Sequence, residues 1–291
     1  MNIQGPVVRK GDLSGSWGKS MFTREIVHGT PHEDLGRAVT GYLGYRTFWP
    51  GPAQWQLLPR GFVMVLFDLE VPQRWVLRGR YQRCDVVVPV SGLHDRVVRF
   101  AQAGRYSGIA ACLSPTAAFA LLGVEMADFG RRWGDLVDHL GSAARDLLGR
   151  LADAVDWPSR FALLDQFLLR ALPARPAVDL AGRAWQRLRS VEGALSVAAL
   201  AEEFSVSTRT LETRFRREIG VSPKNAARIL RFHHAARLLE REDAGLTWIA
   251  HECGYTDHAH FAKDVRAMVG CTPTELRSSL RACGFLQARA E

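Results

Sequence analysis

Two stretches of the chain carry polar side chains at the three- and four-residue spacing that gathers them on one face of a helix. The first stretch holds Arg209, Glu212, Thr213, Arg216 and Arg217. Arginine can donate two hydrogen bonds to guanine, glutamate can accept one from cytosine, and the threonine methyl can touch thymine. The spacing therefore predicts a helix that presents base-reading groups to a groove of double-stranded DNA.

The second stretch presents Ala259, Lys263 and Arg266, with Ala262 on the same face. Two alanines leave this face with fewer hydrogen-bonding groups than the first. We therefore expect the second helix to read bases less strictly and to rely more on phosphate contacts and DNA shape.

Each polar face has an apolar face behind it. At about 100° per residue, Leu211 and Phe215 fall opposite the first face, and Phe261 and Val265 fall opposite the second. This pattern predicts that both helices pack against a core through one side. A merely solvated surface would explain one such helix equally well, but it explains two at matched spacing poorly.

The two helices belong to an internal repeat with a period of 50 residues. The shift superimposes six positions of the first copy on six of the second: Leu211, Phe215, Ile219, Gly220, Ser222 and Pro223 on Phe261, Val265, Val269, Gly270, Thr272 and Pro273. Upstream, residues 200–201 match 249–250 at a shift of 49, so one turn is a residue longer. Each copy reads as short helix, tight turn, polar cap at Ser207 or Asp257, longer helix and glycine, which predicts two helix-turn-helix units.

Residues 190–280 resemble the DNA-binding domain of the AraC/XylS family of bacterial transcription regulators. The resemblance rests on Leu200-Ala201, on the pattern from Ser207 to Phe215, on Gly220-Val-Ser-Pro223, on Arg231 with Ala235 and Leu238-Leu239, on the pattern from Ile249 to Phe261, and on Gly270-x-Thr-Pro273 with Arg277. It implies two helix-turn-helix units joined by a long helix at about residues 223–241. The sequence departs from the family at Ser205, where a glycine is usual, and at Ala226, where an aromatic residue is usual.

The N-terminal half favours strands followed by helices. Short apolar or β-branched runs separated by turn-prone pieces between about residues 54 and 113 predict a barrel or sandwich. Asp135 is expected to cap a helix with an apolar stripe from Leu136 to Leu151, and Pro158 to open another helix. The order of strands and then helices resembles the cupin-like sensor domain of many such regulators.

Such a sensor can hold a small-molecule effector in the mouth of its barrel. The candidate pocket residues are Trp49, Trp55 and Trp75, which lie in or beside the strand region. An aromatic residue at each position is also a common core residue.

The alternative function is that of a metal-dependent cupin enzyme with auxiliary C-terminal helices. Such an enzyme usually needs several histidines and a carboxylate, and the strand region offers only His94. The sequence also lacks the glycine-rich phosphate loops and the nucleophile elbow of common enzyme folds. We therefore expect no catalytic residues, no metal site and no cofactor.

Composition agrees with a nucleic-acid partner. The formal net charge is +8, and the excess gathers at residues 207–231, where seven basic residues (Arg209, Arg214, Arg216, Arg217, Lys224, Arg228 and Arg231) outnumber Glu212 and Glu218. Residues 232–291 hold seven basic and eight acidic residues, so the first unit is expected to dominate affinity. Five scattered cysteines without a CxxC pair, no apolar signal segment and no run of 18 apolar residues favour a cytoplasmic protein.

These observations predict an α+β protein: an N-terminal cupin-like β-barrel with flanking helices, and a C-terminal all-α domain of two helix-turn-helix units joined by a long helix. The expected boundaries are 1–172 for the sensor and dimerisation domain, with strands at about 54–113 and helices at about 115–172, then 173–178 for a linker and 179–291 for the DNA-binding domain. The predicted function is sequence-specific transcription regulation, as an activator, by a homodimer that binds double-stranded DNA, RNA polymerase and a small-molecule effector, away from membranes. A constitutive regulator whose N-terminal domain only dimerises fits the sequence as well.

Overall fold

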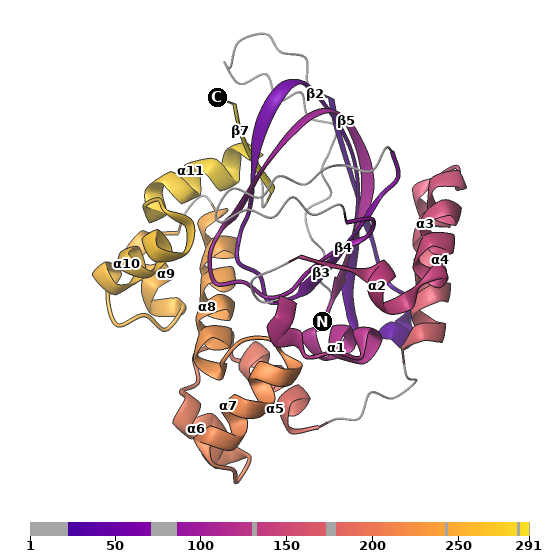
Figure 1. Ribbon diagram of the computed structural model, residues 1–291. Coiled ribbons are helices and arrows are strands. Elements are labelled where there is room, and N and C mark those ends of the chain that lie inside the picture. Colours follow the sequence, from indigo (N-terminus) through magenta and orange to yellow (C-terminus); the bar gives the residue numbers. More distant parts are fainter. Residues whose placement is uncertain are drawn as a thin grey trace.

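An N-terminal antiparallel sheet with its own helices and a C-terminal set of helices make up the computed structural model (Figure 1). The structure describes residues 23–70, 86–129, 133–172, 179–241, 244–283 and 286–290. The fold is therefore α+β, as predicted. The expected linker at 173–178 lies outside the described residues.

The sheet contains seven strands in the order β1-β2-β5-β3-β4-β6, with β7 pairing to β2. Their bounds are β1 Thr23–Gly29, β2 Val39–Leu57, β3 Val63–Asp68, β4 Pro89–Ser91, β5 Val98–Leu113, β6 Gly134–Asp135 and β7 Leu286–Ala290. Five successive residues of β3 are buried, because neighbouring strands flank it and side chains cover both of its faces. This explains why β3 reads in the sequence as an uninterrupted apolar run.

The sheet does not close in the part of the chain that the structure describes. No pairing joins β1 to β6 there, so the described strands form an open, strongly curved sheet and not the closed barrel expected from the sequence. The long strands β2 and β5 pair along most of their length, with an irregularity between Trp49 and Ala53. Such a bulge bends a strand without ending its pairing.

Two strands begin before the predicted strand region. β1 and most of β2 precede residue 54, and glycines interrupt their apolar pattern at Gly29, Gly41 and Gly44. Gly29 and Gly44 have a packing role: an added Cβ would lie 2.6 Å from the ring of Phe161 or Trp157 respectively. Glycine lowers strand propensity but lets another element approach closely, so the close approach of helix α4 (Trp157–Ala171) explains strands that the sequence pattern did not show.

The helices of the N-terminal part follow strands β1 to β5, as predicted, except for the short η1, which lies between β1 and β2. They are η1 Glu33–Leu35, α1 Pro115–Leu122, η2 Met126–Phe129, α2 Leu136–Leu140, α3 Ser142–Asp153 and α4. Asp135 caps α2 by accepting a hydrogen bond from the N–H of Val137 at 3.0 Å, as predicted. The single helix expected after Asp135 is wrong, however, because Gly141 adopts a φ of 57° and separates α2 from α3.

The C-terminal part is helical from Leu180 to Cys283, apart from the segments between its helices. It contains α5 Leu180–Ser190, α6 Val197–Glu203, α7 Thr208–Glu218, α8 Pro223–Leu239, α9 Leu246–Glu252, α10 His258–Val269 and α11 Pro273–Cys283. The expectation that everything after residue 179 is helical is wrong for the last described residues, which form β7 along β2. A strand edge offers unpaired backbone groups, and an extended segment that reaches it can pair with them.

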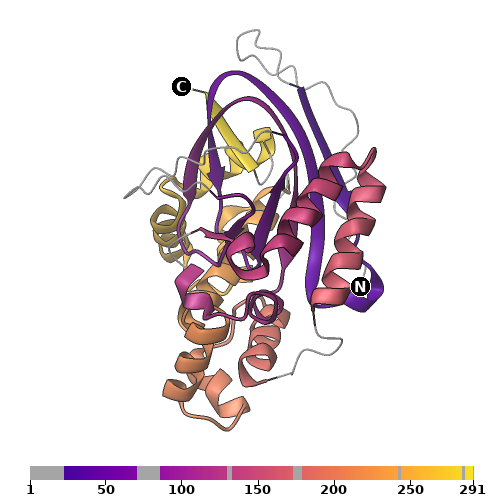
Figure 2. The ribbon, with the colours of Figure 1, turned by 45° about the vertical axis from the view of Figure 1, so that its right-hand side comes forward.

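The two parts share one contiguous hydrophobic core. Figures 1 and 2 show α3 and α4 on one side of the sheet, with α8 and α11 on the other. The turn between β2 and β3 touches α8 directly: a Cβ on Gly61 would lie 2.8 Å from Leu230. The helical part is therefore seated on the sheet.

The contact between β2 and α4 is testable by adding one methyl group. Gly44→Ala places that group against Trp157, and the overpacking is expected to lower the free energy of unfolding by about 1–3 kcal/mol. The matched control is Gly149→Ala in α3, where an added Cβ meets nothing within 4 Å. Alanine should stabilise that exposed helical position by about 0.5–1 kcal/mol. The free energy of unfolding of both variants can be measured with urea. A change in the same direction in both would contradict the close approach of β2 and α4.

Candidate nucleic-acid interface

The two copies of the repeat fold into two pairs of helices with matching caps. Ser207 caps α7 by accepting from the N–H of Thr210 at 3.0 Å, and Asp257 caps α10 by accepting from the N–H of His260 at 2.7 Å. Both caps stand where the sequence predicts them. Each satisfies a backbone N–H that has no partner within its helix, which fixes the residue at which the helix begins.

The turns inside the pairs also match. Ser205 and Gly254 both adopt a left-handed backbone, with φ of 52° and 71°. The next N–H in each copy, of Val206 or Tyr255, donates back to the carbonyl of Ala201 or Ala250 at 3.0 and 2.9 Å. The turn before α10 contains one residue more than the turn before α7, in agreement with the shift of 49 found upstream.

The apolar sides of α7 and α10 are buried as the periodicity predicts. Leu211, Phe215, Phe261 and Val265 are fully buried, and Met268 is 1% exposed. The helical wheel therefore assigned the inward faces correctly, and the opposite faces are the ones presented to solvent.

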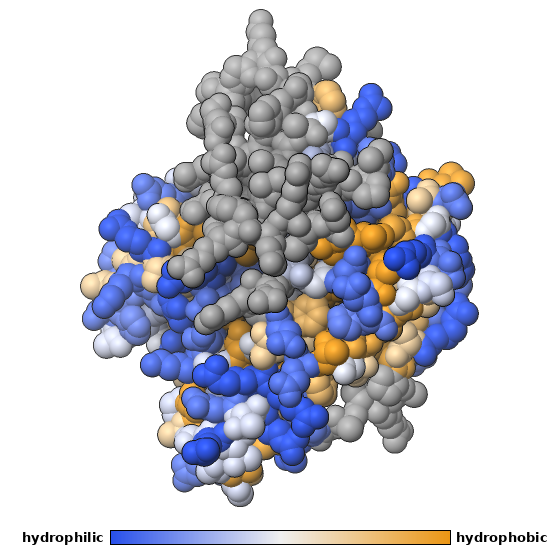
Figure 3. All heavy atoms as spheres, in the orientation of Figure 1, coloured by the Kyte–Doolittle hydropathy of each residue, from blue (hydrophilic) through white to orange (hydrophobic). Residues whose placement is uncertain are grey.

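The candidate DNA-contacting residues lie on those outward faces. Arg209, Glu212, Thr213, Arg216 and Arg217 are exposed on α7, and Ala259, Lys263 and Arg266 are exposed on α10. Hydrophilic residues predominate on the visible surface over α6 and α7 (Figure 3). Each helix thus gathers its candidate residues on one accessible face.

The hydroxyl proton of Thr213 is already used in a hydrogen bond within the helix. Its hydroxyl donates to the carbonyl of Arg209 at 3.0 Å, one helical turn earlier. The side chain consequently offers a partner its oxygen as an acceptor and its methyl group, but not its proton.

Three basic residues of the 207–231 cluster contact other side chains of the protein. Arg214 pairs with Glu218 at 3.4 Å, Arg228 pairs with Asp264 at 2.5 Å, and the guanidinium of Arg231 lies 5.4 Å from the ring centre of Tyr255. The outward charge of this unit is therefore smaller than the sequence count suggests, because Arg228 and Arg231 are half-buried. The exposed basic residues are Arg209, Arg214, Arg216, Arg217 and Lys224. Sequence periodicity could not reveal the partner Asp264, which lies 36 residues from Arg228.

Glu218 is the buried acid of this region, with a side chain 3% exposed. Burial raises its pKa to about 7, and the neighbouring carboxyl of Asp179 adds to the rise, while Arg214 opposes it. Asp179 also caps α5 through the N–H of Gly182 at 2.9 Å. The end of α7 is thereby tied to the beginning of α5 by side chains that the sequence analysis did not single out.

The candidate effector residues are only partly within the described structure. Trp75 lies outside the described residues, and Trp49 and Trp55 belong to β2, whose side chains are not described at those positions. Their predicted role as pocket residues stays a prediction.

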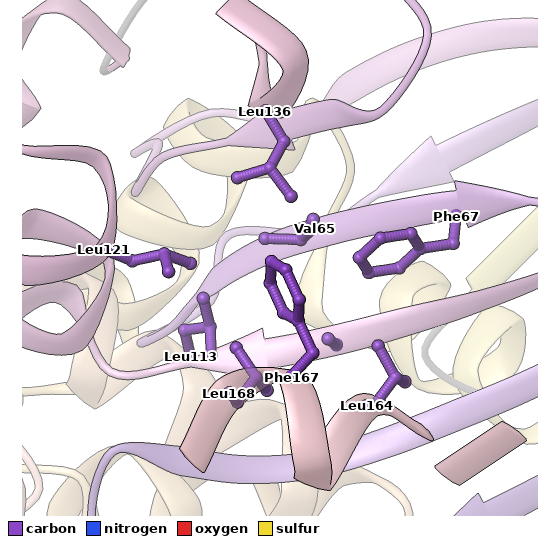
Figure 4. A pocket seen from close by; sticks show the side chains of 9 residues that line it. Val65, Phe67, Leu113, Leu121, Leu136, Leu164, Phe167 and Leu168 are labelled. Atoms are coloured by element: carbon purple, nitrogen blue, oxygen red, sulfur yellow. The ribbon is translucent and has the colours of Figure 1, made fainter. Parts of the chain in front are cut away.

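A small apolar cavity lies between the sheet and its helices (Figure 4). Its volume is about 10 Å³, the size of a single water site. Its lining comes from β3, β5, α1, α2 and α4: Val65, Phe67, Ala111, Leu113, Leu121, Leu136, Leu164, Phe167 and Leu168. An apolar lining of this kind offers no hydrogen bond to a polar ligand.

His94 is half-buried, and its Nδ1 lies 2.8 Å from the carbonyl oxygen of Arg96. Burial lowers the pKa of His94 to about 4, so the ring is neutral at physiological pH. Among the described residues, no three histidine, cysteine, aspartate or glutamate side chains come together as a metal site would require. No described helix is both long enough and apolar enough to cross a bilayer.

In a comparison with known protein families, residues 200–279 match a family model described as a helix-turn-helix domain. The chain is 37% identical over 89 residues to the HTH-type transcriptional activator RhaS of Escherichia coli O139:H28 (strain E24377A / ETEC), and 36% identical over 89 residues to RhaS of Escherichia coli (strain SE11). Each match covers 31% of this chain and 31% of the relative. The chain thus matches about a third of the length of these relatives.

Among solved structures, a transcriptional regulator with an AraC-type DNA-binding domain from Chromobacterium violaceum is 29% identical. That match covers 35% of this chain and 92% of the other, with a TM-score of 0.33. ToxT from Vibrio cholerae is 8% identical and covers 89% of this chain and 98% of its own, with a TM-score of 0.42.

The left-handed turn at Ser205 gives a stability prediction. A non-glycine residue in this conformation costs about 1–3 kcal/mol, part of which glycine recovers. Ser205→Gly is therefore expected to raise the free energy of unfolding by about 0.5–1 kcal/mol in a thermal melt. Gly254→Ser, in the equivalent turn, should lower it by a similar amount. A destabilised Ser205→Gly variant would mean that the serine side chain has a stabilising contact.

Proposed function

We propose that the C-terminal region of this chain is a DNA-binding domain of the AraC/XylS family, and that the protein is an activator of transcription that reads DNA with α7 and α10. In this proposal the helix pairs α6–α7 and α9–α10 are two helix-turn-helix units, and α8 joins them. The protein acts by binding and not by catalysis.

One observation carries the proposal: two helices 50 residues apart have the same caps, the same buried side and the same accessible side. A helix that only closes a core has no reason to repeat its turn geometry and its exposed polar face in a second copy. A protein that follows DNA does, because the major groove returns to the same side of the duplex every ~34 Å, or 10–10.5 base pairs.

The two units contribute differently. The face of α7 carries three arginines, one glutamate and one threonine, whereas the face of α10 carries one lysine, one arginine and one exposed alanine. We therefore assign most of the base recognition and of the electrostatic affinity to the first unit. The second unit contributes mainly phosphate contacts and sensitivity to DNA shape.

The N-terminal part is proposed as a cupin-like sensor of a small-molecule effector. Its curved antiparallel sheet and the helices packed against it support this role, although the apolar cavity beside α4 must widen before a ligand larger than water can enter. RNA polymerase is the further partner that an activator requires.

Assembly as a homodimer is also part of the proposal. The apolar stripe that begins at Leu136 is buried within its own chain, at Leu136, Ala144, Leu147 and Leu151. A dimer must therefore use another surface, for which the exposed Leu169 of α4 is a candidate. Light scattering that gives the monomer mass of 32.4 kDa, with and without DNA, would contradict dimerisation.

Selection of binding sites from random DNA by the full chain tests the function. We expect each protomer to enrich two unlike elements whose centres lie 10–10.5 base pairs apart. The element under α7 should be the stricter of the two. No enrichment would reject DNA recognition, and a single element shorter than about six base pairs would reject the role of α10.

Arg209 is the residue predicted to define a base in the stricter element. Arg209→Ala should weaken binding to the selected site by about 1–3 kcal/mol and relax the preference at one position. The control is Arg214→Ala, which removes an arginine from the same helix that pairs with Glu218. Equal losses by Arg209→Ala on the selected site and on random DNA would identify a phosphate contact and contradict base reading.

A further inference from the structure

The sheet-bearing part of the protein contacts the end of α10. The backbone N–H of Val97, just before β5, donates a hydrogen bond of 2.7 Å to the carbonyl of Met268 in the last turn of α10. Carbonyl groups in the last turn of a helix have no partner within that helix. One of them is here satisfied from a different part of the chain.

The same part contacts the end of α7. Gly220 follows α7 with a φ of 90°, and an added Cβ there would lie 2.7 Å from the carbonyl oxygen of Met126 in η2. A side chain at position 220 would therefore separate α7 from η2. The C-terminal end of α7 is packed against the N-terminal part as closely as backbone allows.

These two contacts fall at corresponding places of the repeat. The 50-residue shift carries Glu218, the last residue of α7, onto Met268, and Gly220 onto Gly270. The N-terminal part thus holds both candidate recognition helices by their C-terminal ends. Their N-terminal halves, which contact base edges in helix-turn-helix proteins, are left accessible.

An ion-pair network adds a lateral contact to α10. Arg228 of α8 pairs with Asp264 of α10 at 2.5 Å and with Asp95, in the loop between β4 and β5, at 3.7 Å. The hydroxyl of Tyr255 donates to the second oxygen of Asp264 at 3.3 Å. One arginine on the joining helix therefore connects the sheet-bearing part to α10.

The position of Asp264 on α10 gives this network its effect. At about 100° per residue, Asp264 lies on the flank of the helix, between the outward Lys263 and the buried Val265. A bond at the flank opposes rotation of the helix about its own axis. Such a rotation would change which side chains face the DNA.

From these contacts we propose that the N-terminal part acts as a brace that sets the spacing and orientation of α7 and α10, and that Asp95 is a positioning residue within it. The inference rests on the proposed DNA-binding function. It assigns to the N-terminal part a role in DNA recognition, which the two helix-turn-helix units alone do not define. The protein should accordingly discriminate between operators by the number of base pairs that separate their two elements.

The test compares full-length variants on DNA of defined spacing. The probes are the site selected by the full chain and the same site with one base pair inserted or removed between its elements. Wild-type protein is expected to prefer the selected spacing at least about 10-fold. Asp95→Asn, which keeps the shape but removes the charge, should reduce that preference about 3-fold, the scale of one partly exposed ion pair. Asp95→Glu should restore most of it.

Asp153→Asn serves as the matched control, because Asp153 is an exposed aspartate at the end of α3, on the side of the sheet opposite α8 (Figure 1). It should leave the spacing preference unchanged. An unchanged preference in Asp95→Asn, or an equal loss of affinity at every spacing, would overturn the brace while leaving DNA recognition intact. Failure of the full chain to enrich any sequence would overturn both.

Discussion

The burial of α8 on nearly every side is the constraint on which the rest of the structure depends. Ten of its residues are buried, and four of these are alanines, so neighbouring backbone comes unusually close. At Gly193 a Cβ would lie 2.2 Å from the carbonyl oxygen of Ala227. Only Lys224 and Arg237 of α8 are exposed, and the helix packs against α5, α9, α11 and the turn before β3. The helix pairs α6–α7 and α9–α10 and the sheet therefore share one central element, and none of them can shift without disturbing its packing.

Sequence reasoning succeeded where the determining interactions are local. The caps at Ser207 and Asp257 and the inward face of α7 depend on residues at most four positions apart, and periodicity contains that information. It failed where the partner lies far along the chain. The glycine at position 44 of β2 is explained by the close approach of Trp157. Arg228 is drawn toward the protein by its ion pairs with Asp264 and Asp95. The break at Gly141 was missed for a different reason, because the apolar stripe continues across it and stays buried.

Fewer positive charges of the helical part face solvent than its composition suggests. The charge of Arg228 is paired with Asp264 and Asp95 within the protein, so it stabilises the arrangement of the helices and contributes little to a polyanion outside. What remains outward belongs mostly to α7 and the start of α8. A polyanion is therefore attracted first to α7 and the start of α8, and α8 fixes where α10 lies relative to them.

The hydrogen bond between Val97 and Met268 has a consequence for how this contact can be inherited. Both of its atoms are backbone atoms, so every amino acid except proline can donate at position 97. Natural substitutions can therefore accumulate on both sides of this junction without loosening it and without leaving correlated changes between the two positions. A junction of this kind remains invisible to comparisons of side-chain identity, and proteins whose N-terminal sequences have diverged beyond recognition can still share it.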